Sequence, residues 1–304
     1  MDWVVALLQA GVDGLAFGSV IALGAIGLTL SYGILRLANF AHGDLLTVGA
    51  YLTLAANGGL NWPLPLAAAM GVLGTMAVTL ICDALLWAPL RSRRATPTTL
   101  MIASIGLALV LRNGLILIWG VSPQRFDLSV SPAIALGDLV LITSSRLWAM
   151  AIALVAVAAV YLLLQKTKIG RAMRAVADSP ELSRISGIPV AMVTIITWLV
   201  TGALAALSGE LLGLITTIRP NMGWLLILPI FAATILGGIG NPYGAIAGAL
   251  IVGVAQEVST VCPASLGSLA QYCLSTDYKL GVGLLIMILV LLFRPRGLFR
   301  GTQG

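Results

Sequence analysis

Charged residues are scarce in this sequence: Asp, Glu, Lys and Arg make up 9% of its 304 residues, while hydrophobic residues make up 59%. An average soluble domain contains about a quarter charged residues, and the mean hydropathy of this chain is +1.04. The chain therefore lacks the polar groups that a water-facing surface needs. This composition excludes a soluble enzyme.

Residues that bind metals or carry catalysis are also few. His42 is the only histidine, and the three cysteines are not at zinc-binding spacing. The sequence contains no H-E-x-x-H, G-x-S-x-G or Walker A motif, and these motifs are short signatures of metalloproteases, serine hydrolases and phosphate-binding loops. We expect no catalytic residue, no metal site and no cofactor. If ATP drives this protein, another chain must bind it.

Long apolar runs occupy most of the chain. A helix needs roughly 20 apolar residues to cross a hydrocarbon layer of about 30 Å, and only helices or closed barrels satisfy every backbone polar group in lipid. The runs are continuous, and the short alternating segments of a barrel are missing. We predict an all-α polytopic membrane protein with about eight or nine segments, forming a single domain over residues 1–304. The predicted segments lie near residues 5–30, 45–56, 64–90, 97–119, 147–164, 191–217, 224–257 and 280–293.

Basic residues gather in three clusters, each beside an apolar run. The clusters are Arg91, Arg93 and Arg94; Lys166, Lys168, Arg171, Arg174 and Arg184; and Arg294, Arg296 and Arg300. The positive-inside rule places all three in the cytoplasm, and the runs between them let the chain leave and return each time. We predict a cytoplasmic C-terminus and extracytoplasmic loops at about residues 120–146 and 258–277. No aromatic residues alternate with the basic ones, so a patch for acidic lipid or nucleic acid is the weaker interpretation of these clusters. The expected partners include membrane lipid around the apolar runs and no nucleic acid.

Two interruptions of the apolar runs differ from ordinary loops: residues 31–44, SYGILRLANFAHGD, and residues 235–244, ILGGIGNPYG. Interrupted segments at corresponding places point to broken helices beside a transport pathway, because helix ends expose unpaired amides and carbonyls. Broken or re-entrant helices and tight turns between helices both fit this pattern. The second interruption divides 224–257 into either a tight pair of spans or a re-entrant hairpin. The candidate translocation residues are Asn39, His42, Gly43, Asp44, Gly237, Gly238, Gly240 and Asn241.

Three charged residues, Arg112, Glu210 and Glu257, lie within or at the margins of apolar runs. Charged side chains in a membrane segment are costly when they face lipid. We expect each of the three to face a cavity or to form an ion pair, although Arg112 and Glu257 also fit positions at the membrane interface.

The three cysteines fall into two groups. Cys82 lies inside a membrane run, where we expect it to be a small apolar filler. Cys262 and Cys273 bracket a loop that we predict to be extracytoplasmic. Disulfides persist in oxidising compartments, so Cys262 and Cys273 can form a disulfide there. Two free thiols are the alternative.

The most informative polar stretch is the predicted cytoplasmic loop at residues 165–190. Its composition favours a helix over 171–177 and a break at 178–180. A second helix then follows, with Ser179 as its N-cap and Pro180 at its first position, and it ends at Gly187. Two short helices across the membrane face suit docking into a groove of a partner, whereas a plain connection needs no such start and stop signals.

Four motifs, in the same order over nearly the whole chain, carry a resemblance to a known family. They are LRLANFAHGDLLTVGAYL (35–52), GRAMRAVADSPELSRISGI (170–188), ILGGIGNPYGAIAGALIVG (235–253) and RPRGLF (294–299). With these motifs the chain resembles the LivH-type permeases of ABC importers for branched-chain and other hydrophobic amino acids. Glu181, Leu182, Ser183 and Gly187 resemble the E-A-A-x-x-x-G signature of importer permeases, with Leu-Ser in place of Ala-Ala.

The resemblance implies a permease domain without enzymatic activity, which moves neutral amino acids into the cytoplasm by alternating access across the bacterial inner membrane. The implied partners are a LivM-type second permease, two cytoplasmic ABC ATPase subunits and an extracytoplasmic amino-acid-binding protein. The loop at 165–190 is then a coupling loop, and both interruptions lie near the translocation path. The implied coupling residues are Arg174, Ala175, Asp178, Glu181, Leu182, Ser183 and Gly187.

Other functions stay open at the level of the sequence. Permeases for urea or short amides share these motifs. An ion-coupled secondary transporter needs titratable relays within the membrane, and this sequence offers few. A membrane-embedded enzyme is disfavoured because catalytic motifs are missing. Copurification of an ATPase is the cheapest observation that separates these classes.

Overall fold

The computed structural model describes residues 2–36, 38–127, 133–136, 140–262, 275, 278–294 and 297–299. The helices are α1 (Asp2–Leu35), α2 (His42–Leu54), α3 (Leu64–Cys82), α4 (Ala88–Ser92), α5 (Pro97–Trp119), α6 (Ser144–Lys166), α7 (Lys168–Asp178), α8 (Pro180–Ile185), α9 (Val190–Ile215), α10 (Met222–Gly237), α11 (Pro242–Val258) and α12 (Lys279–Phe293). Two π-helical turns, η1 (Ala55–Gly59) and η2 (Asp83–Trp87), extend α2 and α3. The strands β1 (Ala133–Leu136) and β2 (Val140–Thr143) form an antiparallel hairpin.

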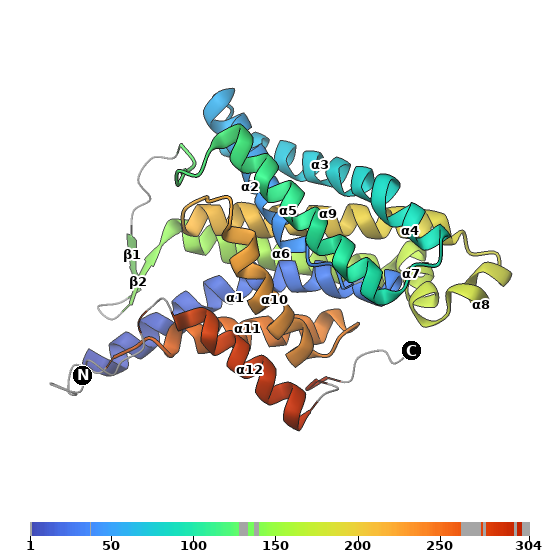
Figure 1. The fold of residues 1–304 in the computed structure, drawn as a ribbon. Coiled ribbons are helices and arrows are strands. Elements are labelled where there is room, and N and C mark those ends of the chain that lie inside the picture. Colours follow the sequence, from blue (N-terminus) through green and yellow to red (C-terminus); the bar gives the residue numbers. More distant parts are fainter. Residues whose placement is uncertain are drawn as a thin grey trace.

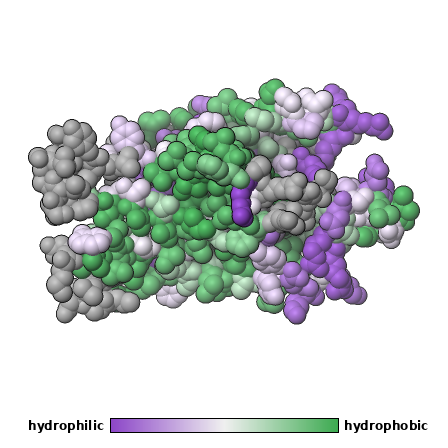
Figure 2. Space-filling view, turned by 90° about the horizontal axis from the view of Figure 1, so that it is seen from below, coloured by the Kyte–Doolittle hydropathy of each residue, from purple (hydrophilic) through white to green (hydrophobic). Residues whose placement is uncertain are grey.

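Most of the molecule is a bundle of apolar helices that lie along its long axis (Figure 1). Five segments of the described chain are long and apolar enough to cross a membrane: α1, α5, α6, α9 and the continuous helical segment Leu64–Ser92. The helices α10, α11 and α12 are apolar but shorter. Apolar residues cover the middle of the bundle, and strongly hydrophilic residues gather at the end where α7 and α8 lie (Figure 2). The prediction of an all-α polytopic membrane protein is confirmed.

The two ends of the bundle carry different elements. The short helices α7 and α8 lie at one end, and β1 and β2 lie at the other (Figure 1); we call them the α7–α8 end and the hairpin end. The predicted loop at 120–146 contains the hairpin, which the sequence analysis did not foresee. The backbones of Gln124 and Ile218 also pair at 2.9 Å in both directions, which ties this loop to the segment after α9.

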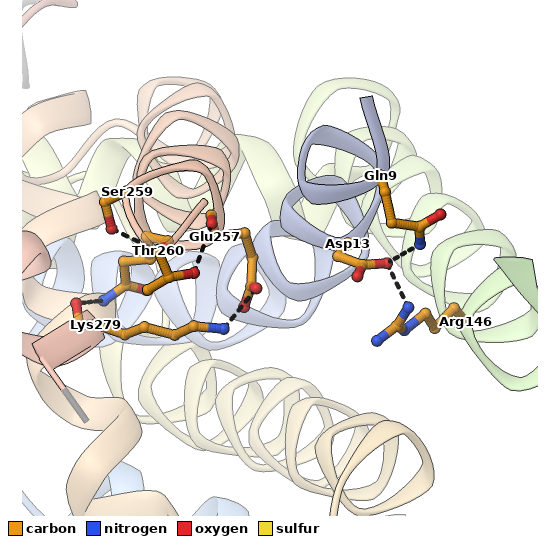
Figure 3. A network of polar contacts seen from close by, with 8 residues as sticks. Gln9, Asp13, Arg146, Glu257, Ser259, Thr260 and Lys279 are labelled. Atoms are coloured by element: carbon orange, nitrogen blue, oxygen red, sulfur yellow. Dashed lines mark hydrogen bonds and ion pairs between the residues drawn. The ribbon is translucent and has the colours of Figure 1, made fainter. Parts of the chain in front are cut away.

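Polar contacts join pairs of helices near the hairpin end (Figure 3). Asp13 of α1 forms an ion pair with Arg146 of α6 and accepts a hydrogen bond from Gln9, whose side chain also bonds the backbone of β2. Glu257 of α11 and Lys279 of α12 form an ion pair at 2.6 Å. The expectation that Glu257 forms an ion pair is thereby confirmed.

The centre of the bundle is built on close contacts at small residues. The most extensive packing is between α1 and α11. A Cβ added to Gly14 of α1 would lie 2.6 Å from the Cα of Val254, and one added to Gly18 would lie 3.0 Å from the carbonyl oxygen of Ala249. The first distance is too short for a Cβ and the second is tighter than an ordinary contact, so the small residues allow the two backbones to pack directly in lipid.

The apolar stretch at 224–257 forms a hairpin of two helices, α10 and α11, which pack on each other. With 16 and 17 residues, they are shorter than the roughly 20 residues of a full crossing. Pro229 lies inside α10, which removes one backbone hydrogen-bond donor from that helix. The predicted pair of short segments, broken at the glycine-rich motif, is therefore present.

The cysteines are described in part. Cys82 is buried and free, as expected of an apolar filler. Cys262 is disulfide-bonded, but Cys273 lies outside the described residues, so the proposed pairing of these two residues stays a prediction.

Candidate functional site

The first interruption is a short connection between α1 and α2 in the interior of the bundle. The Asn39 side-chain oxygen accepts a hydrogen bond from the backbone N–H of Ala41 at 3.1 Å, which shapes the turn before α2. His42 lies with its Nε2 atom 2.9 Å from the carbonyl oxygen of Gly24 in α1. Asn39 and His42 are both fully buried. One ring nitrogen of His42, Nδ1, and the Asn39 amide nitrogen have no partner.

Asp44, in the first turn of α2, is paired with a cation from α5. The Arg112 guanidinium contacts both carboxylate oxygens, at 3.0 and 3.1 Å, and its Cζ lies 4.5 Å from the ring centre of Trp224 in α10. Asp44 is fully buried. The expected ion pair of Arg112 is confirmed, and it joins three helices through a bidentate, charge-assisted contact.

The second interruption is a tight turn between α10 and α11. Gly238 and Gly240 have φ of 99° and 87°, a region that favours glycine because it has no Cβ. The Asn241 side chain caps α11 by accepting hydrogen bonds from the backbone N–H groups of Tyr243 and Gly244, both at 3.1 Å. Gly237 packs directly on Gly244. This motif therefore ends one helix and starts the next within a few residues.

The connection at 165–190 has the predicted geometry. Thr167 caps α7 through the backbone N–H of Gly170 at 2.9 Å, and Ser179 caps α8 through that of Leu182 at 3.3 Å. Gly187 follows α8 with φ of 81°. The predicted two helices, the N-cap Ser179, the position of Pro180 and the glycine stop are confirmed.

The two sides of this helical pair differ in exposure. Met173 and Val176 of α7 are buried against the bundle, and Ser183 of α8 is also buried. Leu182 and Ile185 are 64% and 84% exposed. Ala175 is half-buried, and Arg174, Asp178, Glu181 and Gly187 are exposed. The buried face of the pair therefore packs against the bundle. On the other face, the apolar side chains of Leu182 and Ile185 are not covered by the described residues of this chain.

A cavity of about 290 Å³ brings the helical pair and the second interruption together. Its lining includes Arg174 and Asp178 of α7 together with Gly240 and Asn241 of the α10–α11 turn. Gln165, at the end of α6, donates a hydrogen bond to the Tyr243 hydroxyl at 2.7 Å. Residues that are separate in the sequence thus meet at the α7–α8 end.

The α1 terminus also contacts the helical pair. Arg36, which has φ of 53°, donates a hydrogen bond to the carbonyl oxygen of Ala177 in α7 at 3.1 Å. The Arg174 guanidinium bonds the carbonyl oxygen of Leu164 in α6. Both predicted interruptions therefore connect to α7, the first through Arg36 and the second through the shared cavity. Asn39, His42 and Asp44 lie deeper and line neither this cavity nor the one described next.

A second cavity, of about 610 Å³, lies among α3, α6 and α9. Glu210 of α9 lies in its wall and is 5% exposed, and its Oε1 accepts a hydrogen bond from the Thr53 hydroxyl of α2 at 2.9 Å. The sequence marks Glu210 as a residue that needs a cavity or an ion pair, and the cavity is confirmed. It gives no signal for Thr53 or for Gly71, whose missing side chain leaves room for this contact.

Metal ligands do not cluster in the part of the chain that the structure describes: no group of three or more His, Cys, Asp or Glu residues there could hold a metal ion. The two cavities, the buried ion pair at Asp44 and the exposed helical pair are thus the features on which a function can rest.

Residues 11–291 match the family model described as branched-chain amino acid transport system / permease component. The chain belongs to this family. The BraD permease protein of Pseudomonas aeruginosa, of a high-affinity branched-chain amino acid transport system, is 31% identical over 305 residues, covering 96% of this chain and 95% of BraD. The LivH permease protein of Escherichia coli K12 is 30% identical over 312 residues, covering 96% and 94%.

A third relative is similar over nearly its whole length. The probable LivH permease of Methanocaldococcus jannaschii is 31% identical over 300 residues, covering 93% of this chain and 89% of that protein. The predicted resemblance to LivH-type permeases is confirmed. This permease component is a multi-pass membrane protein and a transport subunit rather than an enzyme.

Proposed function

We propose that this chain is the permease subunit of an ATP-driven ABC importer that moves branched-chain and other hydrophobic amino acids into the cytoplasm. The observation that carries the proposal is the near full-length similarity to branched-chain amino acid permeases. The same similarity disfavours a urea permease or an ion-coupled carrier. A zwitterionic amino acid with an apolar side chain also suits a membrane domain with few fixed charges.

The assembly contains further subunits. Two cytoplasmic ATPase subunits supply the energy, an extracytoplasmic binding protein delivers the amino acid, and a LivM-type second permease completes the pathway in the bacterial inner membrane. The orientation follows from the basic clusters, which place the α7–α8 end and the C-terminus in the cytoplasm. The loops at 120–146 and 258–277 then face the binding protein, in a compartment that permits the proposed Cys262–Cys273 disulfide.

The α7–α8 pair docks into an ATPase subunit. Three observations support this role: the pair stands at the hydrophilic end of the bundle, its caps fix two short helices, and Leu182 and Ile185 are exposed without cover from this chain. Glu181 and Arg184, both exposed, add polar groups around this apolar centre. A small apolar centre with a polar rim is the usual composition of a protein interface.

Movement of the helical pair passes to the pathway by direct contact. When ATP binding closes the ATPase dimer, α7 shifts with it. Arg36 transmits the shift to the first helix interruption, and the residues that line the cavity around Asn241 transmit it to the second. The permease halves then rock about their interface, and access changes from one side to the other. Of the candidate translocation residues, Gly240 and Asn241 are best placed for this step because they line the cavity next to α7.

The proposal predicts a stable complex and ATP-dependent transport. An affinity-tagged chain, extracted from membranes in mild detergent, should copurify with an ABC ATPase that mass spectrometry identifies. After reconstitution of this complex in proteoliposomes with its binding protein, leucine uptake should require ATP and should be reduced by alanine or proline but not by urea. Uptake that proceeds without an ATPase, or that follows an ion gradient alone, would contradict the proposal.

The coupling assignment predicts the effect of one double variant. Replacing Glu181 by Ala together with Gly187 by Val removes a charge of the helical pair and strains a backbone with φ of 81°. Leucine uptake should fall to the level seen without ATP while the binding protein still captures leucine. The matched control is Glu257→Gln with Gly281→Ala near the hairpin end, where a Cβ on Gly281 meets nothing within 4 Å. Normal ATP-driven uptake in the first double variant would overturn the assignment.

A further inference from the structure

The larger cavity lies toward the hairpin end of the bundle. Its lining includes Leu64 at the start of α3, Leu214 near the end of α9 and Phe126, which precedes β1. Ile152, in the first half of α6, closes another side. Leu64 and Leu214 lie near helix ends and Phe126 lies between α5 and β1, so the cavity lies toward the hairpin end, and it shares no described lining residue with the cavity beside α7.

Among the described residues that line this cavity, one side chain is ionisable. Glu210 is 5% exposed, and its surroundings are apolar, with Leu207 and Leu211 on α9 and Val72 on α3. The Thr53 hydroxyl bonds one carboxyl oxygen at 2.9 Å. The four ion pairs found among the described residues do not include Glu210, so none of the cations that the structure describes lies at ion-pair distance from this carboxyl.

An acid in such a place is costly unless something compensates it. A carboxylate in an apolar, membrane-embedded site loses its hydration and needs a cation or several hydrogen-bond donors in return. Thr53 supplies one donor to Oε1, and Gly71 lets the three helices approach closely enough for this contact, because a side chain there would collide with both partners. The arrangement fixes the carboxyl in the cavity wall beside one hydrogen-bond donor and no cation of the described residues, so a cationic group of another molecule can pair with it.

We infer that this cavity binds the hydrophobic amino acid during transport, with its ammonium group on the Glu210 carboxyl and its side chain against Val72, Leu207 and Leu211. The inference rests on the proposed function and adds a binding site within the membrane to it. The volume of about 610 Å³ lies within the roughly 300–1,000 Å³ of small-molecule sites, which combine apolar walls with few polar groups.

The geometry also predicts which part of the ligand matters. An ammonium group supplies a positive charge and up to three hydrogen-bond donors, whereas the corresponding keto acid keeps the carboxylate of leucine and lacks the ammonium group that balances it. The site therefore accepts leucine and amines with the same carbon skeleton and rejects 4-methyl-2-oxopentanoate.

The test is a thiol-labelling measurement on the purified, assembled transporter in lipid nanodiscs. A Val72→Cys variant places a thiol in the cavity wall, and labelling of the parent chain corrects for Cys82, which is buried. Leucine and isopentylamine should slow maleimide labelling of the variant roughly tenfold, as a charge-assisted hydrogen bond predicts. The keto acid should leave the rate unchanged. These comparisons keep Glu210 intact, so they do not depend on how a Glu210 variant folds.

A second arm removes the charge. Glu210→Gln in the Val72→Cys background should abolish protection by leucine in a complex that keeps the subunit composition of the parent. Glu257→Gln is the matched control, because it makes the same change near the hairpin end, and protection should persist. Equal protection by leucine and the keto acid would overturn the inference, and so would absence of protection in a transporter that imports leucine, since that points to a lipid acyl chain as the occupant. A parent complex that imports no leucine would instead refute the proposed function.

Discussion

Two buried acids of this molecule are compensated in different ways. Asp44 on α2 has a bidentate partner, Arg112, at 3.0 and 3.1 Å, and lines neither of the two cavities described above. Glu210 on α9 lies in the wall of a cavity and bonds a hydroxyl, with no cation of the described chain at ion-pair distance. The two residues come from helices that pack on each other. The two acids therefore do not differ in their depth in the bundle. They differ in whether the described chain places a cation next to the carboxylate.

This difference separates structural from functional charge. A paired acid contributes to the fold only while both partners are present, because the remaining charge is strongly unfavourable after one is removed. An acid that the described chain leaves without a cation contributes no ion-pair energy to the fold and is available to a ligand. Asp44 should therefore control assembly, and Glu210 should control substrate binding.

Removal of the Asp44 charge should have the largest effect on stability. Asp44→Asn leaves the Arg112 guanidinium, with 15% of its side chain exposed, without its anion, and breaking a buried pair costs about 3–5 kcal/mol. We expect a marked fall in the thermal midpoint and in the yield of the assembled complex, measured by fluorescence-detected size-exclusion chromatography after heating.

The double variant Asp44→Asn with Arg112→Gln is the internal control for that change. It removes both charges, so the complex should recover most of the lost stability. Asp44 does not stabilise the fold through the ion pair if the double variant is as unstable as Asp44→Asn. The same conclusion follows if Asp44→Asn alone leaves the thermal midpoint unchanged.

Filling the contact between Thr53 and Glu210 should have an intermediate effect. Gly71→Ala places a Cβ 2.5 Å from the Glu210 Oε1 atom and 2.9 Å from the carbonyl oxygen of Gly49, and overpacking of this kind costs about 1–3 kcal/mol. We expect a lower thermal midpoint together with weaker leucine protection of the cavity, because Glu210 must move.

Gly106→Ala on α5 is the matched control for Gly71→Ala, because a Cβ there meets nothing within 4 Å. Alanine favours a helix over glycine by about 0.5–1 kcal/mol, so the thermal midpoint should stay or rise slightly. If Gly106→Ala lowered the thermal midpoint as much as Gly71→Ala does, the effect of Gly71→Ala would not be specific to the packing around Glu210.

The exposed ion pairs should contribute least. Asp13 and Arg146 retain 22% and 32% side-chain exposure, so Asp13→Asn should change stability by less than about 1 kcal/mol. The Gln9 contact in Figure 3 can persist with an amide at this position. The measurement is the thermal midpoint at low and at high salt. If Asp13→Asn lowered the midpoint as much as Asp44→Asn does, ion pairs inside the bundle and at its margin would contribute equally to stability.

Much of the fold was predictable because apolar runs and caps are local signals. The run at 97–119 coincides with α5, and Ser179, Pro180 and Gly187 mark the limits of α8. Hydrophobic length and cap chemistry depend on residues close in sequence. The hairpin β1–β2 was missed, since a short strand pair within a loop leaves no comparable pattern.

The candidate site was predictable only in part. The sequence marks Arg112 and Glu210 as charges that need a partner or a cavity, but it does not indicate which of the two each one has. That outcome depends on contacts between residues far apart in the chain, such as Asp44 with Arg112 and Thr53 with Glu210. The proximity of α7 to the turn at Gly240 and Asn241 was hidden for the same reason.

The most direct test of this account compares Asp44→Asn and Glu210→Gln in one experiment on the assembled transporter carrying Val72→Cys. We expect Asp44→Asn to lower the thermal midpoint and to leave leucine protection intact in the fraction that assembles. Glu210→Gln should leave the midpoint unchanged and abolish protection. The opposite pattern, in which Glu210→Gln lowers the midpoint with protection intact, would contradict the assignment of structural charge to Asp44 and substrate binding to Glu210.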